Sequence, residues 1–368
     1  MANQTSSQGL FFRLHIDITL FTGLITVIIM GQIILYSASS ENIAMMQRQA
    51  IRLGIAFVVM LFIAQISPDT MRRWSPLLFF IGTLMLIAVL LVGTKALGAQ
   101  RWLNLGLFRF QPSEMMKLAV PMMLAWFLSR GNIPPRNKHL LIALAILLVP
   151  VLLIAKQPDL GTSLLVTSAG LFVIFMAGVS WRLIFGFIFA GIAFTIPLWL
   201  FLMRDYQRQR VLTMLNPESD PLGSGYHIIQ SKIAIGSGGS FGKGWLHGTQ
   251  SHLEFLPERH TDFIFSVFAE EFGYSGVLIL LTLYLFIIFR GIYIASQAHG
   301  TFSRLLAASI VLTFLIYIFV NVGMVSGILP VVGVPLPLVS YGGTSIVTLM
   351  TGFGILMSIH THRKLLAH

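Results

Sequence analysis

The chain has 368 residues, of which 56% are hydrophobic and only 10% are charged, and its formal net charge is +11. So apolar a composition is typical of a membrane protein and excludes an ordinary soluble enzyme. The chain contains no cysteine, which excludes disulfides, a thiolate nucleophile and cysteine metal sites.

Ten apolar runs are long enough to cross a bilayer as helices of about 20 residues. The runs are 17–38, 50–67, 75–93, 112–129, 139–156, 160–179, 183–203, 263–289, 303–328 and 336–359. The first run is too long for the core of a signal peptide, so we interpret it as an uncleaved helix. Because the ten runs use more than half of the chain, the sequence predicts a single integral membrane domain over 1–368. The expected fold is an all-α polytopic membrane protein with about ten transmembrane helices.

The distribution of Lys and Arg predicts the orientation of these helices. An even number of spans places both termini on one side, and that side carries eleven basic but only two acidic residues. Cytoplasmic loops are enriched in Lys and Arg, so we expect 1–16 and 360–368 to be cytoplasmic. The short loops of the opposite, outer side also contain many cations, which we interpret as groups that hold an anion. Contact with lipid headgroups is the alternative interpretation.

A long connection, 204–261, joins the seventh and eighth runs. Connections of this length are usually functional or disordered. Its apolar stretch 226–238 predicts a short amphipathic helix, so we expect an ordered, mostly helical extracytoplasmic loop. The glycine-rich stretch 236–244 lacks the spacing of a phosphate-binding loop, and we interpret it as a flexible turn.

The segment LPERHTDFIFSVFAEEFG at 256–273 places ionisable residues where this loop meets an apolar helix. Ionisable groups at a membrane edge favour a functional site. Asp262 is the candidate catalytic residue, because a carboxylate near a helix N-terminus has its pKa lowered and stays ionised. It would act as a general base or as a ligand of a divalent cation. A plain helix cap is the alternative, but the neighbouring Glu258 and His260 argue against it.

A second group of charged residues falls on the same predicted side. Glu114 and Lys117 are three residues apart and share one face of the fourth run, although a Lys near a span end can also snorkel. Asp159, Arg101 and Arg210 follow in nearby loops. Together they describe a polar outer cavity suited to a pyrophosphate and to Mg²⁺.

The chain resembles the SEDS family (shape, elongation, division and sporulation) from about residue 15 to 365. The resemblance is carried, in order, by FQPSEMMKLAVP, QPDLGTS, DYQRQRVLTMLNPESDPLGSGYHIIQSKIAIGSGG, FLPERHTDFIFSVFAEEFG and GILPVVGVPLPLVSYGGTS. The form VVGVPLPLVSYGGTS at 331–345 and the short tails favour the rod-shape branch of the family over the division branch.

The resemblance implies a peptidoglycan glycosyltransferase that polymerises lipid II into β-1,4 glycan strands during cell elongation. The reaction would take place at the outer face of the bacterial cytoplasmic (inner) membrane. The implied partners are a class B penicillin-binding protein transpeptidase, other membrane proteins of the elongation complex, lipid II and undecaprenyl-pyrophosphate-linked glycan, with no nucleic acid. The essential loop aspartate of the family falls on Asp262. The implied substrate-binding positions are Arg101, Glu114, Lys117, Asp159 and Arg210, with Glu258 and His260 beside the aspartate.

Two points stay open from the sequence. A divalent cation, Mg²⁺ or Mn²⁺, is an expected cofactor, with Asp262 as its ligand or as the base. The alternative function is a lipid II flippase, which needs polar groups at mid-membrane depth. The acidic residues here fall almost wholly on the outer side, which favours the transferase. A scaffold that only docks the transpeptidase would not need Asp262 or Glu114.

Overall fold

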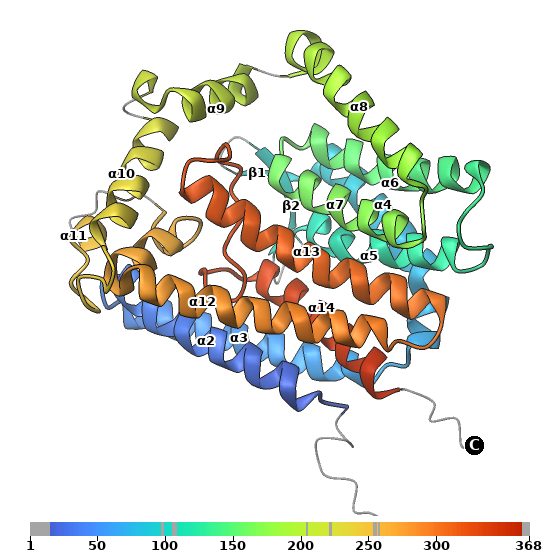
Figure 1. Ribbon diagram of the computed structural model, residues 1–368, viewed down its shortest axis with the longest axis horizontal. Coiled ribbons are helices and arrows are strands. Elements are labelled where there is room, and N and C mark those ends of the chain that lie inside the picture. The colour runs from blue at the N-terminus through green and yellow to red at the C-terminus, as the bar shows by residue number, and fades with distance from the viewer. Residues whose placement is uncertain are drawn as a thin grey trace, which may run out of the picture.

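The computed structural model describes residues 15–96, 99–104, 109–203, 205–220, 223–252, 256 and 258–362. Long helices lie side by side in a bundle, and shorter helices gather at one end (Figure 1). Seven helices in the described ranges are long and apolar enough to cross a membrane: α2 (Ile18–Ala38), α3 (Ile43–Ala64), α4 (Pro68–Val92), α6 (Asn137–Lys156), α12 (Ile264–Ser296), α13 (Thr301–Val325) and α14 (Thr344–Thr361). Three helices of 17 residues account for the other runs: α5 (Pro112–Leu128), α7 (Leu160–Met176) and α8 (Trp181–Pro197). The prediction of about ten helices is confirmed.

The last helix begins later than the sequence predicts. The run 336–359 was expected to be helical throughout, but α14 begins at Thr344 and residues 330–343 form no regular element except a short turn. Pro335 and Pro337 lack the backbone N–H that a helix needs, which explains the delay. The proline-rich segment is therefore an ordered loop at the end of the bundle.

A small sheet, which the sequence did not predict, connects α4 to α5. It consists of β1 (Thr94–Ala96), β2 (Ala99–Asn104) and β3 (Arg109–Phe110), which pair antiparallel in the order β1-β2-β3. Strand β2 carries Arg101 at the end of the bundle where α5 begins. Pro112 occupies the first turn of α5, where its missing N–H leaves no hydrogen bond unmade.

Helix α13 forms the centre of the bundle and packs against α5, α7, α12 and α14, while α14 packs closely on α3. Helix α8 stands at the edge of the bundle and packs chiefly on the following π-helical turn η1 (Leu198–Leu202) (Figure 1). The long connection contains α9 (Asp205–Leu215), η2 (Pro217–Ser219), α10 (Ser224–Ser237) and α11 (Thr249–His252). The expected helix at 226–238 is confirmed as α10, which packs on α12.

Helix α12 is broken at Gly273, where φ is 64° and ψ is −165°. The glycine-rich turn 238–244 packs directly on this break, and Tyr274 N–H donates to the oxygen of Gly239 at 2.9 Å. A Cβ atom on Gly273 would lie 2.2 Å from the nitrogen of Gly242, so only glycine allows this approach. The stretch is a turn, as expected, and its backbone hydrogen bonds hold the broken helix.

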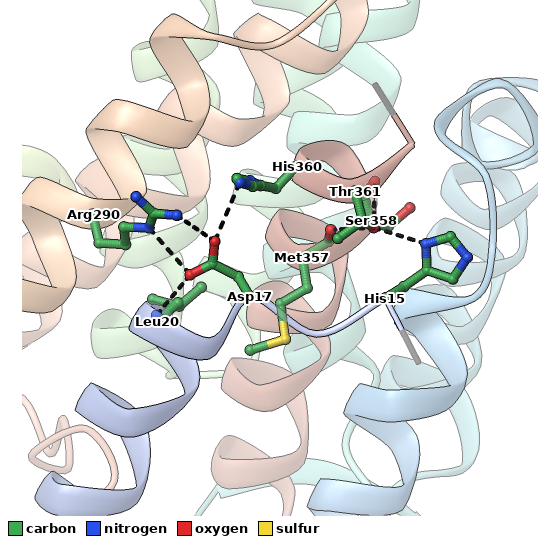
Figure 2. A network of polar contacts seen from close by, with 8 residues as sticks. All are labelled: His15, Asp17, Leu20, Arg290, Met357, Ser358, His360 and Thr361. Carbon is green, nitrogen blue, oxygen red and sulfur yellow. Dashed lines mark hydrogen bonds and ion pairs between the residues drawn. The ribbon is translucent and has the colours of Figure 1, made fainter. Parts of the chain in front are cut away.

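The two ends of the described chain meet at the opposite end of the bundle (Figure 2). Arg290 Nη2 lies 2.6 Å from Asp17 Oδ2, and His360 Nε2 lies 3.3 Å from the same oxygen. His15 Nδ1 lies 2.9 Å from Thr361 Oγ1. Burial raises the pKa of Asp17, but hydrogen bonds from Arg290 and from the first turn of α2, together with the charges of His360 and Arg290, outweigh burial and lower it. The predicted terminal segments 1–16 and 360–368 lie mostly outside the described residues.

Candidate active site

Asp262 lies in a turn that leads into α12. The turn is closed by Thr261, whose N–H donates to the oxygen of Glu258 at 3.0 Å and whose hydroxyl donates to Glu258 Oε2 at 2.7 Å. The N-cap of α12 is Phe263, and no side chain caps the helix. Asp262 is therefore not a helix cap, which removes the structural alternative for this carboxylate.

The proline-rich segment before α14 wraps around Asp262. Ser340 Oγ donates to the oxygen of Thr261 at 2.6 Å, and Tyr341 N–H donates to the oxygen of His260 at 2.8 Å. A Cβ atom on Gly333, where φ is 71°, would lie 3.4 Å from Asp262 Oδ2. The backbone at Gly333 thus lies against the carboxylate, about 70 residues further along the chain.

The environment of Asp262 raises the pKa of its carboxyl group to about 6. Burial is the main cause, the negative charge of Glu258 adds to it, and the positive charge of Arg210 opposes it. The expectation of a lowered pKa is wrong, because the helix end does not supply a cap and the turn is half-buried. A carboxylate with a pKa near 6 is still mostly ionised at pH 7 and is well suited to accept a proton.

Glu114 and Lys117 form a buried ion pair on the first turns of α5. Lys117 Nζ lies 2.6 Å from Glu114 Oε1, and both residues are less than 10% exposed. Lys117 therefore does not snorkel toward water. The second oxygen, Glu114 Oε2, has no hydrogen-bond partner in the described ranges. A buried charge pair with a spare acceptor favours a functional role over a structural one.

Asp159 caps α7 and connects the sheet to α5. Its Oδ1 accepts from Thr162 N–H at 3.3 Å, and its Oδ2 accepts from Gln111 Nε2 at 3.0 Å. Arg101 Nη1 lies 3.9 Å from Asp159 Oδ1, and Arg101 Nη2 donates to the oxygen of Pro158. The structure thus brings Arg101 and Asp159 together, as the sequence predicted.

Helix α13 connects this ion-pair group to Asp262. Lys117 Nζ lies 5.1 Å from the ring centre of Tyr317, close enough for a cation–π contact. One helical turn further along α13, Asn321 Nδ2 donates to the oxygen of Asp262 at 2.9 Å. Sequence reasoning missed both residues. The signal was available for Asn321, because an amide inside an apolar run is a candidate functional group.

The remaining candidate residues lie around the turn or, in the case of His260, within it. Arg210, on α9, acts electrostatically on Asp262. The His260 ring packs edge-to-face on Tyr341 at 6.0 Å. His227, on α10, was missed by the sequence: its ring stacks on Phe263 at 5.7 Å. Burial lowers the pKa of His227, although nearby carboxylates oppose the shift.

The carboxylates near the turn could contribute to a metal site only together with other ligands. No group of three His, Asp or Glu side chains gathers into a metal site within the described part of the chain. Mg²⁺ is commonly held by one or two carboxylates together with water and the phosphates of a substrate. Asp262 and Glu258, which interact electrostatically, fit that kind of site.

Known proteins resemble this chain along its full length. The sequence profile of the cell cycle protein family of FtsW, RodA and SpoVE matches residues 11–365. The peptidoglycan glycosyltransferase MrdB of Escherichia coli K12 is 55% identical over 367 residues, which cover 100% of this chain and 99% of that protein.

Two solved structures also match. A chain from a peptidoglycan synthase complex that coordinates polymerisation and crosslinking superposes with a TM-score of 0.82 at 34% identity, over 95% of this chain and 98% of that one. The rod shape-determining protein RodA of Thermus thermophilus superposes with a TM-score of 0.72 at 28% identity, over 95% of this chain and 98% of that one. The chain therefore belongs to the FtsW, RodA and SpoVE family, the SEDS family indicated by its motifs.

Proposed function

We propose that this chain polymerises lipid II into β-1,4 glycan strands during cell elongation, with Asp262 as the general base. The chain is a peptidoglycan glycosyltransferase, as is indicated by its identity of 55% to a relative of that name over the whole length. The observation that carries the catalytic assignment is the half-buried Asp262, whose pKa of about 6 suits a base at neutral pH.

The reaction joins two lipid-linked sugars. The 4-hydroxyl of the acceptor N-acetylglucosamine attacks the anomeric carbon of the donor, while Asp262 takes the hydroxyl proton. The new carbon–oxygen bond forms as the bond to the donor pyrophosphate breaks, and the α-linked donor is inverted to a β-1,4 linkage. General-base assistance of this kind contributes roughly 10²–10⁴-fold.

The leaving pyrophosphate gathers negative charge, which the cationic side of the cavity would stabilise. Lys117, Arg101 and Arg210 are the candidate groups, with Asp159 and Gln111 holding the first turn of α5 beside them. Preorganised charge around a developing anion is often the largest catalytic contribution. Asp262 and Glu258 are the residues that would hold a divalent cation, which would supply further charge neutralisation when bound.

The location and partner are also part of the proposal. The chain is a multi-pass membrane protein, and we place it in the bacterial cytoplasmic (inner) membrane with both termini inside and 204–261 outside. Its relative in a complex that coordinates polymerisation and crosslinking supports a class B penicillin-binding protein as partner. Glu258 and His260 would line the sugar-binding side of the turn.

The test is polymerisation of purified lipid II by the detergent-solubilised protein with its cognate transpeptidase and Mg²⁺. We expect long strands from the wild type and from Asp205→Asn, a control on the fully exposed Asp205 side chain. Asp262→Asn should make no strands. Polymerisation by Asp262→Asn at the wild-type rate would remove Asp262 as base, and no polymer from the wild type would favour the flippase.

A further inference from the structure

A cavity opens at the end of the bundle opposite to Asp262. Helices α5 and α7 begin beside the active site, so the turns that follow them, 129–136 and 177–180, lie at the far end. The cavity lies between these two turns and the starts of α6 and α8, and its volume is about 190 Å³. A single water molecule needs about 10–15 Å³ on this measure. The cavity therefore has room for an organic ligand, such as a phosphate with the glycerol group attached to it.

The wall of the cavity combines polar and apolar surface. Asn137, at the start of α6, and Ser180, directly before α8, are exposed and supply polar side chains. Pro134 and Leu183 supply apolar surface. At Gly178, where φ is 87°, a Cβ atom would lie 3.7 Å from Pro134 Cβ, so the two turns lie against each other. Such a wall suits a ligand that has a polar head and an apolar tail.

Three exposed cations lie on the segment that carries Asn137. Arg136 and Lys138 flank this residue directly. Arg130 lies at the start of the same turn, with its guanidinium 3.8 Å from the ring centre of Trp126. Within the part of the chain that the structure describes, none of the three cations forms an ion pair. Cations without acidic partners at the edge of a cavity favour an anionic ligand, above all a phosphate.

Helix α8 gives a ligand at this position a structural role. The helix stands at the edge of the bundle and packs chiefly on η1 (Figure 1). It begins directly after the turn 177–180, which lines the cavity. A group held between this turn and the start of α6 therefore ties the first residues of α8 to the bundle.

We propose that this cavity binds the headgroup of an anionic phospholipid, with the phosphate held by Arg136, Lys138 and Asn137 and the acyl chains lying along α8. Basic pockets between membrane helices on the cytoplasmic side are typical sites for such headgroups. The orientation proposed above places this end of the bundle in the inner leaflet, from which the lipid enters sideways. The site is separate from Asp262, and its occupation does not depend on the transferase reaction.

The first test measures lipid binding by the full-length, detergent-solubilised protein. The protein is titrated with dioleoyl-phosphatidylglycerol and, separately, with dioleoyl-phosphatidylcholine, whose headgroup carries the same phosphate but no net charge. Native mass spectrometry counts the bound lipids. We expect one tight site for phosphatidylglycerol and binding of phosphatidylcholine that is at least tenfold weaker. Equal affinity for the two lipids overturns the proposal.

Two double variants with the same change of net charge separate the site from the basic surface in general. Arg136→Gln with Lys138→Gln removes the cations beside Asn137. Arg73→Gln with Arg304→Gln removes two exposed cations at the same end of the bundle, on α4 and α13. The first pair should weaken phosphatidylglycerol binding by about 20–30-fold, the effect of two cations near a phosphate, and the control pair by less than threefold. Similar losses in both double variants overturn the proposal, because they show attraction to the surface alone.

The last test locates the lipid. A phosphatidylglycerol analogue with a photoreactive diazirine close to its glycerol is irradiated with the wild-type protein, and the labelled peptides are identified by mass spectrometry. We expect labels within 130–140 and 178–190, and we expect an excess of unlabelled phosphatidylglycerol to remove them. Labels confined to other helices overturn the proposal. Equal protection by inorganic phosphate also overturns it, because the cavity would then hold a free anion and not a lipid.

Discussion

The side-chain amide of Asn321 donates hydrogen bonds to the main-chain oxygens of Asp262 at 2.9 Å and Val334 at 2.7 Å. One buried amide inside α13 therefore ties together the turn of the catalytic aspartate and the proline-rich segment. The position of Asp262 is set by the helix bundle, although the residue itself lies in a loop. A displacement of a catalytic group by about 1 Å can reduce a rate by about 10²-fold.

Replacing Asn321 should alter the position of Asp262 without changing its charge, so it tests how far the rate depends on that position. In Asn321→Leu, the buried bond to the Val334 oxygen and the part-buried bond to the Asp262 oxygen are both lost, which costs about 2–4 kcal/mol of unfolding free energy. We expect kcat for polymerisation to fall by about 10–100-fold. Thr282→Val, on the exposed side of α12, is the control and should keep both stability and kcat. Wild-type kcat in Asn321→Leu would show that the amide does not position Asp262.

The pH dependence of polymerisation should follow Asp262. The base must be ionised, so kcat/KM should fall as the pH drops through about 6, the raised pKa of its carboxyl group. In Glu258→Gln a negative neighbour is removed, the pKa falls and the acid limb moves to lower pH. In Arg210→Gln a positive neighbour is removed and the limb moves to higher pH. Shifts in the same direction would contradict this assignment.

The buried pair of Glu114 and Lys117 allows stability to be separated from catalysis. Lys117→Met leaves Glu114 charged and unpaired inside the bundle, which should cost about 3–5 kcal/mol. The double variant Glu114→Gln, Lys117→Met removes both charges and should recover most of that loss in a thermal unfolding assay. Polymerisation should stay reduced at least 100-fold in both, since the cation near the leaving group is gone. An active double variant would make the pair purely structural.

The ion pair between Asp17 and Arg290 should act on stability alone. Asp17 has a lowered pKa, so its stabilising effect is present above its ordinary value of 3.8 and is lost as the pH falls through the lower folded-state value. Arg290→Met leaves the buried Asp17 without its main partner and should cost about 3 kcal/mol at pH 7. The difference from wild type should shrink below about pH 4. Arg304→Met, on an exposed side chain, should leave the unfolding midpoint unchanged.

The break in α12 should depend on glycine. Gly273→Ala places a Cβ atom 2.2 Å from the nitrogen of Gly242 and also strains a residue with φ of 64°. Gly239→Ala has a similar φ of 57° but open space around it, so it isolates the backbone strain of about 1 kcal/mol. We expect Gly273→Ala to lower the thermal unfolding midpoint and the polymerisation activity clearly more than Gly239→Ala does. Equal effects would mean that the close approach is dispensable.

The sequence by itself determined the membrane helices and the main charged groups. Span length and hydropathy are properties of consecutive residues, because a bilayer requires every spanning helix to satisfy its own backbone and present apolar side chains. The pairing of Glu114 with Lys117 also followed from their spacing of three on one helix. The sequence also contains prolines at the start of the last run. Their effect on the start of α14 was missed because the prediction of that helix rested on the hydropathy of the whole run.

Only the tertiary structure decided the surroundings of Asp262. Its neighbours at Asn321, Gly333 and Ser340 are about 60 to 80 residues away along the chain, and contacts at such separations leave no local periodic signal. The pKa of the carboxyl group depends on its burial and on charges from other elements. Local reasoning therefore predicted the wrong direction for it. The sequence alone shows where the ionisable residues lie along the chain. Packing between distant segments decides how those residues act on one another.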